Sequence, residues 1–166
     1  MLGRGGSSEQ TPGTRRAITE LYETQYERVA RYVFTRIGNM HEAEDLASEV
    51  FVRALRSSHK YVDTGAPLEA WIFKIAHNIV VDHFRKKSRR GETVELDAAG
   101  ERREELQQLH KAMESVTDAQ RQVLALRFGA EMTSEEAAEV MGKKPGAVRE
   151  MQSAAIKKLR EVMRDG

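Results

Sequence analysis

Apolar residues recur along this chain at intervals of three and four positions, the spacing at which side chains share one face of an α-helix. No segment alternates apolar and polar residues with the period of two that a half-buried strand requires. The pattern therefore predicts an all-α fold, with longer helices in the first half of the chain and shorter ones in the second.

Three helices are predicted in the first half. The first carries the stripe Leu21, Tyr26, Val29, Val33 and Ile37 and ends at Gly38. Asn39 and Glu42 have the spacing of a capping box, in which each side chain accepts from the other residue's backbone N–H, so a second helix begins there. Residues 61–67 form a turn, and an apolar stripe from Leu68 to Phe84 marks the third helix. These stripes are able to share one core.

The second half repeats this logic in shorter elements. A helix is predicted around residues 102–114. Thr117 with Gln120, and Thr133 with Glu136, form two further capping boxes, each opening a helix that ends at a glycine. Pro145 suits the first position of the last helix, because its missing N–H has no partner there.

We expect four segments along the chain. Residues 1–14 are rich in Gly, Ser, Thr and Pro and are expected to be mobile. Residues 15–90 form a first helical domain, residues 91–104 an acidic, flexible linker, and residues 105–166 a second helical domain.

Composition excludes several functions. The 166 residues include no cysteine, so disulfides, thiolate chemistry and cysteine-based zinc sites are absent. The five histidines are dispersed and do not converge as ligands, so neither an enzyme, a metal site nor a cofactor is expected. No apolar run is long enough to span a membrane and no secretory signal is present, so we expect a cytoplasmic protein.

Charge is strongly segregated although the formal net charge is only +1. Residues 74–90 and 143–164 are basic, and the acidic stretch 91–105 separates them. Two basic blocks indicate two contacts on one polyanion.

Residues 133–161 have the pattern of a helix-turn-helix: a short capped helix, a glycine-containing turn and a longer basic helix. The outer face of the second helix would present Arg149, Glu150, Ser153 and Lys157 to a major groove. The alternative is a solvated, charged helix in an ordinary bundle.

Residues 71–90 read WIFKIAHNIVVDHFRKKSRR. A helix C-terminus favours positive charge, but one or two cations satisfy that preference, and the surplus indicates an external anion. Asn78 lies among apolar residues and offers both a donor and an acceptor to a base edge. The turn at residues 63–67 is placed to wall a pocket for an unstacked base. The alternative is a core helix with a solvated basic end.

Three segments of the chain, taken in order, resemble an extracytoplasmic-function sigma factor of bacterial RNA polymerase. They read HEAEDLASEVFVRAL, APLEAWIFKIAHNIVVDHFRKKSRR and LALRFGAEMTSEEAAEVMGKKPGAVREMQSAAIKKLRE. The resemblance extends over residues 15–161. It implies two helical domains that bind core polymerase and promoter DNA, select the promoter and open the duplex, with no bond made or broken.

The resemblance also implies roles for individual residues. The segment docking on the clamp of the largest polymerase subunit would use Glu44, Asp45, Ser48, Glu49 and Arg53. The minus-10 element would be bound, with one base extruded beside Asn78, by Asp63, Thr64, Trp71, Lys74, Asn78, Asp82, His83, Arg85, Lys86, Lys87, Arg89 and Arg90. The minus-35 element would be bound by Thr133, Lys144, Arg149, Glu150, Ser153 and Lys157. Met151 and Ala154 stand where family members often carry basic residues.

Partners are implied as well. Family members are usually sequestered by an anti-sigma factor, so we expect one here, and we expect no membrane contact by this chain itself. Two other interpretations stay open: a helix-turn-helix regulator that acts without core polymerase, and an anti-sigma-type or scaffold bundle whose basic faces bind acidic protein.

Overall fold

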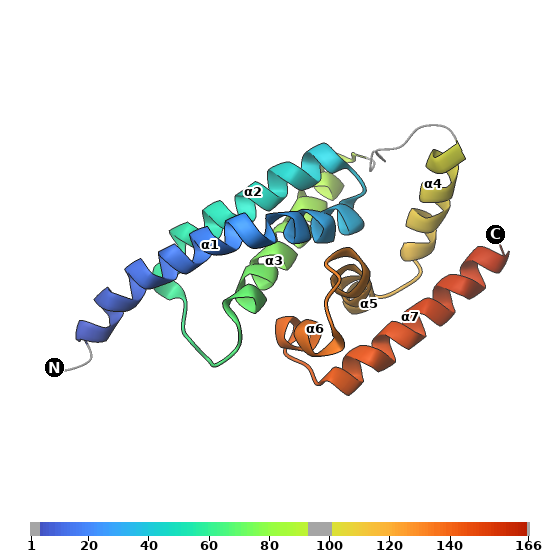
Figure 1. Cartoon of the computed structure of the whole chain (residues 1–166). Helices are drawn as coiled ribbons and strands as arrows, with labels where there is room; N and C mark the ends of the chain where they lie inside the picture. The colour runs from blue at the N-terminus through green and yellow to red at the C-terminus, as the bar shows by residue number, and fades with distance from the viewer. Residues whose placement is uncertain (1–3, 93–100, 166) are drawn as a thin grey trace.

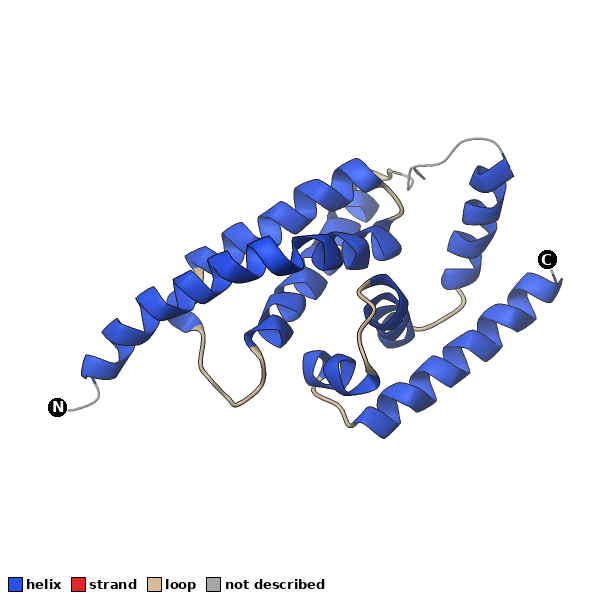
Figure 2. Ribbon diagram, in the orientation of Figure 1, coloured by secondary structure: helices blue, strands red, loops and turns tan. Residues whose placement is uncertain are grey.

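The computed structural model describes residues 4–92 and 101–165, with only the backbone described at 4–12, 101–103 and 106. Every regular element in these ranges is helical (Figure 2). The elements, in chain order and as drawn in Figure 1, are α1 Arg4–Ile37, α2 Met40–Arg56, η1 Ser58–Lys60, α3 Leu68–Arg90, α4 Glu101–Met113, α5 Asp118–Leu124, η2 Ala125–Gly129, α6 Ser134–Met141 and α7 Pro145–Asp165. The predicted all-α fold is confirmed.

Helices α1, α2 and α3 form the first bundle, as the apolar stripes predict. Gly38 adopts a φ of 78°, which lets the chain reverse directly after α1. Asn39 then caps α2, its side-chain oxygen accepting from the Glu42 N–H at 3.0 Å. The interior is filled by large side chains from all three helices, including Tyr32, Val50 and Phe73. Burial of these stripes holds the bundle together.

Helices α4 to α7 form the second bundle. Both predicted capping boxes are complete, at Thr117 with Gln120 and at Thr133 with Glu136. Gly142 ends α6 in the left-handed region at a φ of 63°, and α7 begins at Pro145. Helices α6 and α7 therefore form the predicted helix-turn-helix. The π-helical turn η2, which follows α5 without a break, is a feature that the sequence pattern did not predict.

The two bundles pack directly against each other. Turn η2 lies against α1 and helix α6 lies against α3, while α7 lies on the outer side of the second bundle (Figure 1). One apolar cluster runs through the contact, joining Val29 and Val33 of α1 to Leu126 of η2 and Val140 of α6. A smaller cluster around Val116 fixes α4 and α5 to α7.

Two predicted segment boundaries bear on the described residues. Helix α1 begins at Arg4, inside the segment 1–14 for which the sequence predicts mobility; that mobility stays a prediction. Most of the predicted linker 91–104 lies at 93–100, outside the described residues, and α4 begins at Glu101. Among the described residues, none of the helices has the length and hydropathy needed to cross a membrane.

Candidate nucleic-acid interface

Helix α3 carries one outward stripe of polar residues. Its members are three or four positions apart over about five turns, so they share one face: Trp71, Lys74, Asn78, Asp82, Arg85 and Arg89. Lys74, Asn78, Arg85 and Arg89 are exposed, and Trp71 and Asp82 are half-buried. The opposite face is apolar and buried, with Ile72, Ile79 and Val80 in the core. The stripe can therefore present an amide and several cations to a ligand along about 27 Å of helix.

Four of the predicted minus-10 residues on α3 are not members of this stripe: Lys86 and Arg90, which are exposed, and His83 and Lys87, which are half-buried. Lys87 turns toward α2, where its Nζ lies 3.1 Å from Glu42 Oε1 and 3.2 Å from Oε2. His83 Nε2 lies 3.5 Å from Glu42 Oε2, and burial lowers the pKa of this histidine, which favours its neutral form. Glu42, His83 and Lys87 thus form a half-buried cluster, named here the Glu42 cluster, that ties the end of α3 to the start of α2.

The Glu42 cluster also explains why the capping box predicted at Asn39 forms only in part. Asn39 accepts from the Glu42 N–H, as expected. The Glu42 carboxylate, however, pairs with Lys87 from α3, and His83 lies beside this pair. A charged partner stabilises a carboxylate more than a neutral backbone N–H does, so the tertiary contact prevails over the local one.

The remaining charged residues of α3 pair more loosely. Lys86 Nζ lies 3.2 Å from Asp82 Oδ2, and this hydrogen bond holds the pKa of Asp82 below its ordinary value. The charge of Arg53 in α2 lowers the pKa of Asp82 further. Arg90 lies 3.9 Å from Glu92. These exposed pairs stabilise the fold little, and their cations can exchange a carboxylate for a phosphate at small cost.

The turn before α3 adjoins the same stripe. Asp63 Oδ1 accepts from the Gly65 N–H at 2.9 Å, which shapes the turn, and Thr64 beside it is exposed. Tyr61 packs on Trp71, with ring centroids 5.2 Å apart. Tyr61 is not among the predicted site residues, although an aromatic residue at the edge of a polar turn is a usable signal for base stacking. The pair places two aromatic rings where the turn meets the stripe.

The predicted polymerase-contacting residues divide between two edges of α2. Glu44, Asp45 and Ser48 are exposed together, on the side away from the core residues Ala43, Ala47 and Val50. Glu49 and Arg53 are half-buried. The exposed acidic face is therefore built from Glu44, Asp45 and Ser48.

Helix α7 presents the predicted recognition residues on one face. Arg149, Glu150, Ser153 and Lys157 are all exposed, while Val148 and Ala155 are buried on the opposite side. Arg149 lies 3.7 Å from Glu135 of α6. Lys144 is exposed in the turn before α7. Thr133 is exposed as well, but its hydroxyl oxygen is used as the cap of α6, accepting from the Glu136 N–H at 3.1 Å.

Family comparisons match both bundles. Residues 21–90 match the model of sigma-70 region 2, and residues 112–161 match that of sigma-70 region 4. The chain is 32% identical to the ECF RNA polymerase sigma factor BldN of Streptomyces coelicolor, over 92% of this chain and 62% of BldN. It is also 32% identical to the ECF RNA polymerase sigma factor ShbA of Streptomyces griseus, over 89% of this chain and 88% of ShbA. The chain thus spans less than two thirds of BldN and most of ShbA.

Solved structures share the fold. CnrH, in complex with the cytosolic domain of CnrY, aligns with a TM-score of 0.69 at 22% identity, over 96% of this chain and 95% of CnrH. RpoE of Bartonella quintana, in complex with the anti-sigma factor NepR, aligns with a TM-score of 0.66 at 21% identity, over 90% of this chain and 98% of RpoE. With regions 2 and 4 in order and two such relatives, the chain belongs to the extracytoplasmic-function sigma factors, the non-enzymatic subunits that direct RNA polymerase to promoters.

Proposed function

We propose that the outward stripe of α3, with the turn at residues 61–67, captures the minus-10 element of the promoter. The observation that carries this proposal is the continuity of the stripe: an amide at Asn78 lies between the aromatic pair Tyr61–Trp71 and the cations Arg85 and Arg89. An extruded base can stack near the aromatic pair while the cations bind flanking phosphates. Extrusion costs a few kcal/mol, which stacking and phosphate contacts together can offset.

The cations of α3 have different roles in this proposal. Arg85, Lys86, Arg89 and Arg90 are exposed and bind phosphates. Lys87 is held by Glu42 and, with His83 beside them, positions α3 on α2. Asp82 orients Lys86 through their ion pair. The basic end of α3 thus combines a structural cluster with a set of phosphate ligands.

In the second bundle, α7 binds the minus-35 element in the major groove. Arg149, Glu150 and Ser153 face base edges, and Lys144 and Lys157 bind phosphates. Thr133, the exposed N-cap of α6, also contacts the DNA. On binding DNA, Arg149 leaves its ion pair with Glu135 and donates two hydrogen bonds to the edge of a guanine. Glu150 accepts from a cytosine amine and disfavours other bases by charge repulsion.

Core polymerase binds the exposed acidic face of α2, formed by Glu44, Asp45 and Ser48, with Glu49 and Arg53 at its edge. The docking site on the polymerase is the clamp of its largest subunit. An anti-sigma factor covers these faces when transcription is not required; the structure of RpoE in complex with the anti-sigma factor NepR supports this part of the proposal. The chain acts in the cytoplasm, where polymerase and promoter are found, and it needs no cofactor.

Transcription from a promoter library tests this proposal. Core RNA polymerase from Streptomyces coelicolor is mixed with the full chain and with templates randomised in two blocks about 25 base pairs apart. We expect the chain to associate stoichiometrically with core polymerase. We also expect the transcribed templates to share a preferred sequence in each of the two randomised blocks. Enrichment of one block, or DNA binding without core polymerase, would support a helix-turn-helix regulator and contradict the proposal.

A further inference from the structure

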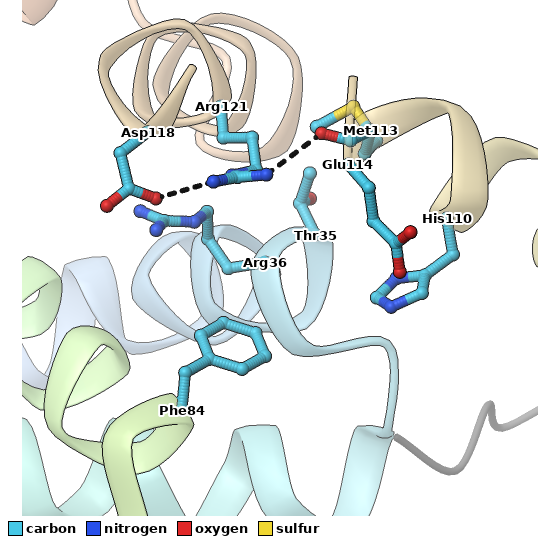
Figure 3. Close-up of a pocket in the computed structure, with 8 residues that line it drawn as sticks. All are labelled: Thr35, Arg36, Phe84, His110, Met113, Glu114, Asp118 and Arg121. Atoms are coloured by element: carbon cyan, nitrogen blue, oxygen red, sulfur yellow. Dashed lines mark hydrogen bonds and ion pairs between the residues drawn. The ribbon is translucent and has the colours of Figure 1, made fainter. Parts of the chain in front are cut away.

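A cavity of about 310 Å³ lies where the end of α1 meets α4 and α5, and Figure 3 shows the side chains around it. Its wall receives side chains from four helices: Arg36 from α1, Phe84 from α3, His110 and Met113 from α4, and Arg121 from α5. Small-molecule sites in proteins have volumes of about 300–1,000 Å³. The cavity is therefore large enough for a ligand, and it combines charged with apolar groups.

Arg36 is a buried cation whose bonded partners are neutral. The residue is 7% exposed, and its Nη1 donates to the Tyr32 hydroxyl at 3.2 Å and lies 3.4 Å from His77 Nδ1. Burial and the charge of Arg36 both lower the pKa of His77, which keeps that ring neutral. Both contacts use Nη1, so among the described residues the edge formed by Nε and Nη2 has no hydrogen-bond partner. A buried charge without a charged partner costs free energy, and an anion in the cavity would remove that cost.

Two carboxylates border the same cavity, but both lie toward solvent. Asp118 Oδ1 lies 2.8 Å from Arg121 Nη2, and the Asp118 side chain is 71% exposed. The hydrogen bond from Arg121 lowers the pKa of Asp118, and the charge of Arg36 adds to this effect. Arg36 points toward Asp118 in Figure 3 without forming an ion pair with it. Glu114 is exposed. The buried end of the cavity is thus positive, and the negative charges lie at its rim.

A second cavity, of about 360 Å³, adjoins the first, and the walls of both include Thr35, His110 and Met113. Leu109 and Phe128 line the second cavity and are 41% and 59% exposed, so large apolar surfaces there face water. Apart from Gly38 and the three shared residues, the lining is entirely apolar: Phe34, Leu109, Leu124, Phe128, Ile156 and Leu159. The joined cavities therefore form an apolar trough that ends at a buried cation.

We propose that these joined cavities bind an amphipathic carboxylate, a small molecule with one carboxylate and an apolar tail. The carboxylate accepts two hydrogen bonds from the Nε and Nη2 edge of Arg36, because a guanidinium fork matches the geometry of a carboxylate. The tail lies along Phe34, Phe128 and Leu159, where it leaves water. This site belongs to the free chain and needs neither polymerase nor DNA.

Occupancy of the site has a consequence for transcription. The ligand contacts residues of both bundles, so by mass action it stabilises the arrangement in which they pack against each other. In the proposed function the two bundles contact separate promoter elements, so the ligand should reduce transcription. This consequence, unlike the site itself, rests on the proposed function.

Isothermal titration calorimetry of the full chain with decanoate tests the site. We expect one saturable site per chain. Decanol has the same tail without the charge and should bind at least tenfold more weakly. Octanoate should bind about fifteenfold more weakly than decanoate, since each methylene group removed from an apolar site weakens binding about fourfold.

Two variants separate the head of the ligand from its tail. Arg36→Gln keeps a donor for Tyr32 and should weaken decanoate binding at least tenfold while decanol binding stays unchanged. Phe128→Ala should weaken both ligands to the same extent. Arg16→Gln, at an exposed arginine of α1, and Met163→Ala, at an exposed apolar residue of α7, lie outside both cavities and should change neither affinity. Circular dichroism verifies that all variants are equally helical.

Absence of saturable decanoate binding, or equal affinities for decanoate and decanol, overturns the proposal. Binding that neither Arg36→Gln nor Phe128→Ala weakens places the ligand elsewhere and overturns it as well. If Arg36→Gln does not fold, the comparison of the two ligands and the Phe128→Ala variant decide.

Transcription separates this site from the proposed function. With the site supported, decanoate should reduce transcripts in the reconstituted assay, and Arg36→Gln should resist that reduction. Decanoate binding without this reduction would support the site and exclude its regulatory consequence. A chain that binds decanoate and never associates with core polymerase would support the site and contradict the proposed function.

Discussion

Replacing Lys87 and Arg85 separately tests the division of the α3 cations into structural and DNA-binding groups. The side chain of Lys87 is 12% exposed and its Nζ lies 3.1 Å from the Glu42 carboxylate, whereas Arg85 is exposed on the outward stripe. An exposed ion pair contributes about 0.2–1 kcal/mol, and breaking a buried pair costs about 3–5 kcal/mol. Because Glu42 remains 37% exposed, we expect Lys87→Ala to lower the free energy of unfolding by about 1–2 kcal/mol.

Thermal unfolding and salt titration measure the two roles. For a chain of this size, the stability loss at Lys87 lowers Tm by about 2–8 °C. Arg85→Ala should leave Tm nearly unchanged, since exposed substitutions alter stability by less than about 0.5 kcal/mol. With the holoenzyme on promoter DNA, Arg85→Ala should reduce the slope of log affinity against log salt by about 0.7–0.9, the effect of one lost phosphate contact.

The matched comparison is decisive because both residues are cations two positions apart on one helix. Lys87→Ala should lower Tm and leave the salt slope unchanged. If Lys87→Ala reduces the slope as much as Arg85→Ala does, with no loss of stability, Lys87 binds phosphate and the structural role of the Glu42 cluster is refuted.

Three further predictions concern the other sites. Asn78→Ala should reduce promoter opening at least tenfold in a permanganate footprint while core association stays constant; equal losses in both assays would exclude base capture by Asn78. The exposed pair Glu44→Lys and Asp45→Lys should weaken core binding at least tenfold without lowering Tm, and unchanged binding would place the polymerase contact elsewhere. Burial lowers the pKa of both His77 and His83, so the unfolded state binds more protons as the pH falls below about 6.5, and stability should decrease there; a double His→Asn variant should show a flatter dependence in urea unfolding between pH 7 and 5.

Much of the candidate site follows from periodicity. The spacing of Trp71, Lys74, Asn78 and Arg85 places them on one helical face whatever α3 packs against, and the same holds for Arg149, Ser153 and Lys157 on α7. Which cations remain free was not predictable, because Lys87 and Glu42 are 45 positions apart and meet only when α2 and α3 pack. The hydrogen bonds from Arg28 and Arg31 to the Ala130 and Gly129 carbonyls of the second bundle were equally hidden, since arginines on the polar side of a helix have the same pattern when they face solvent.

The local sequence by itself determined where the helices begin and end. Asn39, Thr117 and Thr133 cap their helices, Gly142 ends α6, and Pro145 begins α7, because each depends on backbone bonds within one turn of chain. Tertiary structure decided the partner of Glu42, the π-helical turn before Ala130 and the packing of the two bundles against each other. Those features depend on which surfaces exclude water together, and periodicity along one helix carries no information about the helix that it will meet.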